Sequence, residues 1–102
     1  MAPVVTVFRS RLRERHDGYE ETAAGLEAAA RAMPGFVDFK SFTAADGERV
    51  SIVTFDSPES QAAWRDDPRH RAAQRRGRQE WYAAYHIQVC ELRAEHRFDG
   101  CA

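Results

Sequence analysis

Hydrophobic and polar residues follow one another in this 102-residue chain in patterns that predict alternating strands and helices. Residues 4–12, VVTVFRSRL, are rich in β-branched and aromatic side chains and predict a strand. Residues 17–33 carry apolar side chains at three- and four-residue spacings, which predicts a helix that Pro34 and Gly35 end. Residues 36–43 and 49–55 predict two further strands, and the Asp46-Gly47 pair between them favours a hairpin turn.

The second half of the chain predicts two consecutive helices and a final strand. Ser57 and Pro58 are typical of a helix start. That helix should end near Asp67, because a residue before proline is disfavoured in the helical conformation. Pro68 then opens a helix to about residue 82, and residues 85–95 predict the last strand. The order is the ferredoxin-like split β-α-β-β-α-β pattern of an α+β domain with a four-stranded antiparallel sheet.

Both faces of the predicted sheet carry apolar side chains. In the first and last strands they occur at odd and even positions alike: Val4, Val5, Val7, Phe8, Leu12, Ile87, Val89, Cys90 and Leu92. Strands that are apolar on both sides imply that both sheet faces are covered. The helical segments can cover only one, so we expect a second copy on the other, giving a sheet-to-sheet homodimer. In such a strand Cys90 is predicted to be an inert core thiol.

Composition and charge narrow the function classes. The length suits a single domain over residues 1–102. Fifteen basic and sixteen acidic residues nearly cancel, so the chain as a whole has no polyanion-binding character. It has neither a membrane-span-length apolar run nor a signal-peptide pattern. Cys90 and Cys101 are too few for a disulfide scaffold. We therefore expect a cytoplasmic protein that binds neither nucleic acid nor membranes.

The helix predicted from Pro68 has two chemically different sides. One side carries mostly small and polar residues: His70, Ala73, Gln74, Gly77, Trp81 and Ala84. The other carries Arg69, Arg71, Arg75, Arg76, Arg78 and Gln79. The arginines lack interleaved aromatic or base-reading groups, and acidic residues lie nearby, which is typical of a solvated face. The adjacent Asp66-Asp67 pair is more typical of a helix cap than of acid–base chemistry.

His70 and Gln74 are the candidate chemistry of this helix. They lie one turn apart among small residues, and Trp64 approaches from the preceding helix. Buried polar groups need partners. The two side chains therefore either bond to each other and to the sheet as core residues, or line a cavity. The sequence leaves both interpretations open.

Several segments together resemble the antibiotic biosynthesis monooxygenase superfamily of dimeric α/β barrels. They are FRSRL, MPGFVDFKSF, GERVSIVTF, AWRDDPRHRAAQ and YHIQVCEL. The resemblance implies a homodimer with a pocket between sheet and helices in each protomer. It also implies one of two activities. One branch oxidises aromatic, polyketide-like molecules with dioxygen and no metal or flavin, and the other binds and degrades heme.

The heme-degrading branch has three signature residues, of which this chain keeps one. Trp64 matches the tryptophan that opens the second helical region. Ser10 stands where the branch has an asparagine, and Gln74 stands where it has the histidine ligand. His70, one turn before Gln74, is the remaining candidate for an axial ligand.

The resemblance therefore favours an oxygenase without a cofactor, acting on a small aromatic molecule. In this interpretation His70 is the base, because its ordinary pKa lies near neutrality. Gln74 and Ser10 orient the substrate. The predicted pocket walls are Trp64, Trp81 and Phe8. The alternatives are heme binding, with a tetrapyrrole ligand and His70 on the metal, and a non-catalytic dimeric ligand-binding module.

Overall fold

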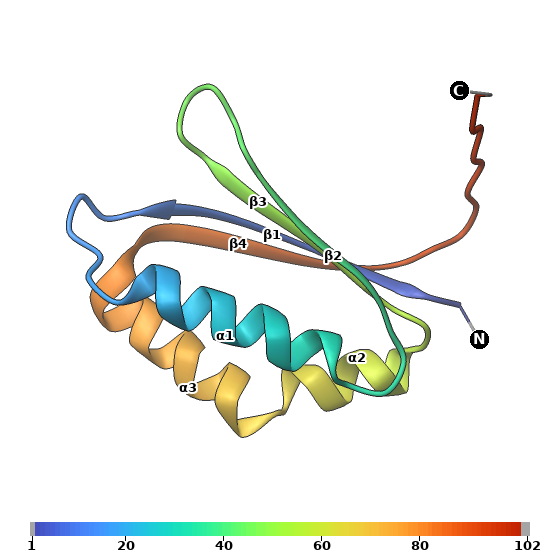
Figure 1. Ribbon diagram of the computed structural model, residues 1–102, viewed down its shortest axis with the longest axis horizontal. Helices are drawn as coiled ribbons and strands as arrows, with labels where there is room; N and C mark the ends of the chain where they lie inside the picture. The colour runs from blue at the N-terminus through green and yellow to red at the C-terminus, as the bar shows by residue number, and fades with distance from the viewer. Residues whose placement is uncertain (1, 101–102) are drawn as a thin grey trace.

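A four-stranded antiparallel sheet, with helices packed on one side of it, forms the body of the computed structural model, which describes residues 2–100 (Figure 1). In chain order the elements are β1 (Val4–Leu12), α1 (Tyr19–Arg31), β2 (Phe36–Thr43), β3 (Arg49–Phe55), α2 (Pro58–Arg65), α3 (Pro68–Arg76), the π-helical turn η1 (Gly77–Trp81) and β4 (Tyr82–Glu91). The strands lie in the order β2-β3-β1-β4. The predicted α+β class and the ferredoxin-like element order are confirmed. Cys101 lies outside the described residues.

Local sequence signals explain most element boundaries. Ser57 Oγ accepts a hydrogen bond from the Ser60 N–H at 3.1 Å and caps α2. Asp67 Oδ1 accepts from the Arg69 N–H at 2.9 Å and caps α3, so its predicted capping role is confirmed. The hairpin between β2 and β3 turns at Gly47, whose φ of +92° favours glycine. Helix α1 begins at Tyr19, two residues later than predicted, because Gly18 has a φ of +84°.

The end of the second helical region differs from the prediction. Helix α3 stops at Arg76, and the strand begins at Tyr82, before the expected residue 85. Between them the guanidinium of Arg13 donates to the carbonyls of Arg78, Gln79 and Tyr82 at 2.8–3.1 Å. These contacts satisfy carbonyls that a helix end leaves free. Consequently Ala84, expected on the inner side of a helix, lies exposed in β4.

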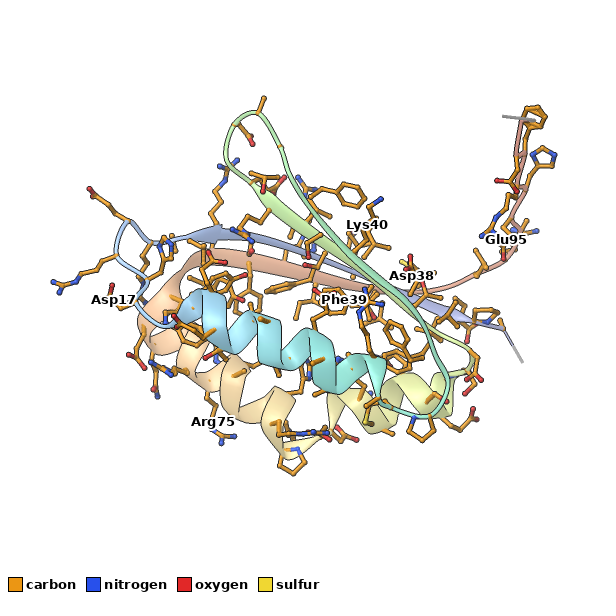
Figure 2. All side chains as sticks on the ribbon, viewed as in Figure 1. Asp17, Asp38, Phe39, Lys40, Arg75 and Glu95 are labelled. Atoms are coloured by element: carbon orange, nitrogen blue, oxygen red, sulfur yellow. The ribbon has the colours of Figure 1, made fainter. Side chains whose placement is uncertain are left out.

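The strand register shows which side chains face the helices. Val4 pairs with Phe55 and Thr6 with Val53 on this side, and Phe55 and Val53 join Ala30 and Trp64 in the hydrophobic core. By the same alternation, Phe8 and Ser10 also face the helices. Phe8 pairs with Ser51 and Ile87, and Ser10 pairs with Arg49 and Tyr85. On β2, Phe39 points toward the helices and Lys40 to the opposite side (Figure 2).

The opposite sheet face carries no helix in the described chain (Figure 1). Cys90 shares this face with Val5 and is exposed. The prediction of a core thiol was therefore wrong for the single chain, because β4 is an edge strand and this side of it has no cover. Within residues 2–100, no helix has both the length and the apolar character that crossing a membrane requires.

Candidate functional site

A strip of aromatic and aliphatic side chains on the helix side of β1 and β4 stays partly open to solvent. We call it the helix-side strip, and it consists of Phe8, Tyr82, Tyr85, Ile87 and Val89. Tyr85 and Ile87 are 37% and 36% exposed, and Val89 is 55% exposed. The strip is open because α1 packs on β2 and α2 packs on β3. These strands lie toward the edge of the sheet opposite β4, so the same face is left uncovered over β4. Exposed apolar side chains gathered in this way are typical of binding and interaction surfaces.

Three rings of the strip form one aromatic cluster. The ring centroids of Phe8, Tyr82 and Tyr85 lie 5.5–5.7 Å apart in edge-to-face and tilted arrangements. Such packing holds the three rings in fixed mutual orientations. The cluster therefore forms a rigid aromatic surface beside the exposed Ile87.

Polar groups border the aromatic cluster. Ser10 is only 4% exposed and lies beside Tyr85 in the strand register. Arg78 Nη1 donates to the Tyr85 hydroxyl at 3.3 Å. Burial, reinforced by the neighbouring Tyr19, raises the pKa of Tyr82 well above its usual value. Tyr82 is thus a neutral phenol at physiological pH.

His70 lies against Trp64 at the start of α3. The two ring centroids are 4.8 Å apart with an interplanar angle of 32°, and His70 Nδ1 is 3.3 Å from the Arg65 carbonyl oxygen. A carbonyl can only accept, so this contact is a hydrogen bond only when Nδ1 carries the proton. In the neutral ring Nε2 is then the basic nitrogen.

Burial sets the protonation state of His70. Desolvation lowers the pKa of its imidazole below 6.5, and this effect exceeds the opposing influence of the Arg65 carbonyl and the Asp67 charge. The ring is therefore neutral at pH 7. A neutral imidazole can accept a proton, as a general base must.

The path of α3 relates His70 to the strip. His70 contacts Trp64, which packs with Val53, and at the other end Gly77 lies against the Tyr82 ring. Along β1, Val53 is paired with Thr6 and Tyr82 with Leu12, and Phe8 and Ser10 lie between these two positions on the same face. Gln74 is half-buried and lies one helical turn before Gly77. The structure thus places His70 against Trp64 and Phe8 in the aromatic cluster, and among residues 2–100 it shows no hydrogen bond or ring contact that joins His70 or Gln74 to Ser10 or Phe8.

Both tryptophans make close structural contacts. Trp64 belongs to the hydrophobic core. Trp81 is buried, donates through Nε1 to the Asp17 carbonyl at 2.9 Å, and packs edge-on against Tyr19. The guanidinium of Arg76 lies 4.6 Å from the centre of its ring. Their additional role as pocket walls stays a prediction.

The arginine-rich side of α3 faces solvent, as predicted, and Arg75 points away from the sheet (Figure 2). Arg69 pairs with Asp67 at 2.9 Å and Arg76 with Glu80 at 3.0 Å. Hydrogen bonds from Arg69 hold the pKa of Asp67 down at about 2. Arg78 departs from the pattern, because it reaches Tyr85. That this face does not bind nucleic acids stays a prediction.

Neither Tyr82 nor Tyr85 was predicted as a site residue, because the predicted helix included Tyr82 and Tyr85 was assigned only to the start of the last strand. The available signal was the spacing of Tyr85, Ile87 and Val89, since side chains two apart in a strand share one face. No cluster of three or more potential metal-binding side chains occurs among residues 2–100.

Comparisons with known proteins bear on the family. The family model described as "Antibiotic biosynthesis monooxygenase" matches residues 3–76. "Uncharacterized protein YqjZ" of Bacillus subtilis (strain 168) is 33% identical over 92 residues, which make up 90% of this chain and 81% of that protein.

Solved structures agree in fold. Rv0793 from Mycobacterium tuberculosis has a TM-score of 0.82 at 17% identity, with 94% of this chain and 100% of that chain covered. SnoaB, a cofactor-independent oxygenase from Streptomyces nogalater, has a TM-score of 0.77 at 16% identity, with 93% and 97% covered. At these identities the likeness concerns the fold alone.

Proposed function

Because the chain belongs to the antibiotic biosynthesis monooxygenase family, we propose that it oxidises a small aromatic, polyketide-like molecule with dioxygen, without metal or flavin. The observation that supports this proposal most directly is the helix-side strip. Its exposed Tyr85, Ile87 and Val89 offer an apolar surface beside an aromatic cluster. SnoaB, which has the same fold, is described as a cofactor-independent oxygenase.

The proposed chemistry needs a general base, a hydrogen-bond donor to the substrate oxygen, and an apolar surface that excludes water. For a substrate such as an anthrone, His70 Nε2 removes a proton from the ring CH₂ carbon. The carbanion reduces dioxygen, the two combine, and protonation gives a hydroperoxide that loses water. The balance is one CH₂ plus O₂ giving one C=O plus H₂O. Gln74, Ser10 and the neutral Tyr82 hydroxyl would orient the substrate oxygen, and the apolar strip would exclude water.

The test uses His70→Gln with a dihydroxyanthrone as substrate. Oxygen uptake and quinone absorbance above the buffer rate should fall by about 100-fold or more, because glutamine cannot accept the proton. The wild-type rate should fall with acidification below pH 6.5, since the pKa of His70 is lowered from that value and protonation removes the base. The variant should lack this dependence.

The matched control is Arg75→Gln on the outer side of α3, which should retain the wild-type rate. A His70→Gln protein with the wild-type rate and pH profile would refute His70 as the base. Saturable binding of the anthrone without any turnover would instead favour the non-catalytic ligand-binding module.

Heme binding is the second candidate, and one contact favours it. Metal-binding histidines commonly hold their other nitrogen on a carbonyl, as His70 Nδ1 is held near Arg65. His70 would then hold the heme iron through Nε2, and heme would supply oxygen activation. Ser10 and Gln74 differ from the heme-degrading signature, so we favour the reaction without heme. Titration with hemin distinguishes the two candidates. A shift of the Soret band with the wild type that is absent with His70→Gln would favour heme binding.

We further propose a homodimer through the sheet face that carries no helix. Apolar side chains run across β1 and β3 on this face, where Val5, Val7 and Val50 are half-buried and Ile52 is exposed. Phe42, 48% exposed, extends the patch onto β2. A stable interface of this kind buries on the order of 2,000 Å² or more.

The expected result for this interface is a dimer at micromolar concentration that Ile52→Arg converts to monomer, measured by sedimentation velocity. The charge would be buried without a partner in the dimer and solvated in the monomer. Val89→Arg, on the helix side of the same sheet, is the control and should stay dimeric. A monomeric wild type, or a dimeric Ile52→Arg, would show that this face is not the interface.

A further inference from the structure

A hollow of about 480 Å³ opens where β1 ends beside the β2–β3 hairpin and the start of β4. Its polar lining consists of Arg11, Arg13, His16, Thr43, Asp46 and Arg49. These residues come from β1, the loop after it, the two hairpin strands and the hairpin turn. Three guanidinium groups therefore line the hollow together with one carboxylate.

Arg49 is the best-placed donor in this hollow. Its side chain is 33% exposed, and its guanidinium lies 5.4 Å from the centre of the Tyr19 ring. The nearest carboxylate is that of Glu20 at 3.8 Å, beyond hydrogen-bonding distance. Within residues 2–100 this guanidinium makes no side-chain hydrogen bond. Stacking thus orients the planar group while its N–H donors stay available.

The other charges leave the hollow positive. Arg11 is neutralised by Asp46, with Nη2 and Oδ2 2.8 Å apart. Arg13 donates three N–H hydrogen bonds to backbone carbonyls, and its positive charge has no carboxylate partner among the described residues. Arg13 and Arg49 therefore contribute two positive charges, of which Glu20, paired with Arg49 at 3.8 Å, offsets one.

We propose that this hollow binds an oxyanion, namely a carboxylate or phosphate group carried by a small molecule. Arg49 would donate two parallel hydrogen bonds, the geometry in which a guanidinium best recognises such groups. The Thr43 hydroxyl, on the residue paired with Arg49 across β2 and β3, can donate a third. Arg13 would add attraction without direct contact. The site does not depend on the proposed oxygenase activity.

The experiment is a ¹H–¹⁵N NMR titration with inorganic phosphate and, separately, with benzoate, at constant ionic strength made up with chloride. Saturable shifts are expected at Thr43, Gly47 and Arg49. Arg49→Gln should weaken binding about tenfold or more, because a hydrogen-bonded charge is lost. Arg49→Lys keeps the positive charge but lacks the two parallel N–H donors of the guanidinium, and it should bind the anion with intermediate affinity. Arg75→Gln is the matched control and should bind as the wild type does.

Each outcome bears on the proposal. Binding of phosphate alone, or of benzoate alone, supports it and identifies the group. Flat titrations with both anions overturn it, as does wild-type affinity in Arg49→Gln. If Arg49→Gln fails to fold, Arg49→Lys decides, since it retains a cation above Tyr19. Because no turnover is measured, the result is independent of whether the anthrone is oxidised.

Discussion

Gly35→Ala is expected to lower the free energy of unfolding by about 2–5 kcal/mol, combining a left-handed backbone cost with overpacking. Gly35 has a φ of +83°, which side chains disfavour. An added Cβ would also overlap Ser60 Oγ and lie 2.5 Å from Asp56 Oδ1. Urea denaturation of wild type and variant measures the difference.

The neighbours of Gly35 cannot yield without losing hydrogen bonds. Ser60 Oγ donates to Asp56 Oδ1 at 2.9 Å and also accepts from Ser57 Oγ at 3.1 Å. The Asp56 N–H donates to the Gly35 carbonyl at 2.8 Å. A methyl group at residue 35 would therefore disturb the start of α2 as well as its own loop.

Gly47→Ala is the matched control for Gly35→Ala. Gly47 has a φ of +92°, but an added Cβ would meet nothing within 4 Å. Only the backbone cost of about 1–2 kcal/mol should appear. Gly25→Ala, inside α1 and equally open, should instead stabilise the protein by about 0.5–1 kcal/mol. Equal losses at Gly35 and Gly47 would show that contacts with Ser60 and Asp56 contribute nothing.

The parts of the fold that sequence analysis predicted depend on short-range chemistry. Ser57 and Asp67 cap helices through backbone groups two or three residues away. The Asp46-Gly47 turn needs only its own residues and the strands that it joins. In each case the residues that determine the structure are neighbours in the chain, so the pattern is visible in the sequence.

The boundary between α3 and β4 depends on long-range contacts instead. Arg13 reaches carbonyls that are 65 to 69 residues away, and no spacing in the sequence reveals this. Tyr85 is open because α1 and α2 pack over β2 and β3, on the same face of the sheet but away from β4. Arg13, Thr43 and Arg49 meet only because a strand end and a hairpin lie together. Residue types at a site can be recognised in the sequence, whereas their assembly requires the fold.

Gly77→Ala is the other change with a large expected effect, and packing decides its sign. Gly77 has φ −57° and ψ −47°, a helical conformation in which alanine alone would be more stable by about 1 kcal/mol. An added Cβ, however, would overlap Cε2 of Tyr82 and lie 2.7 Å from Cδ2. The Tyr82 ring packs edge-on against Phe8 and Tyr19, so its displacement disturbs the aromatic cluster. We expect a net loss of about 1–3 kcal/mol in urea denaturation.

A double-mutant cycle with Tyr82→Ala separates packing from any backbone effect at Gly77. Once the ring is gone, Gly77→Ala should be neutral or stabilising, because only the helical preference of alanine remains. The coupling between the two positions should therefore be opposite in sign to the single-site loss and at least as large. In the folded Gly77→Ala protein, oxidation of the dihydroxyanthrone should also fall, since the displaced Tyr82 ring borders the proposed substrate surface. An equal destabilisation by Gly77→Ala with and without the Tyr82 ring would place its cause in the backbone of η1 rather than in the aromatic cluster.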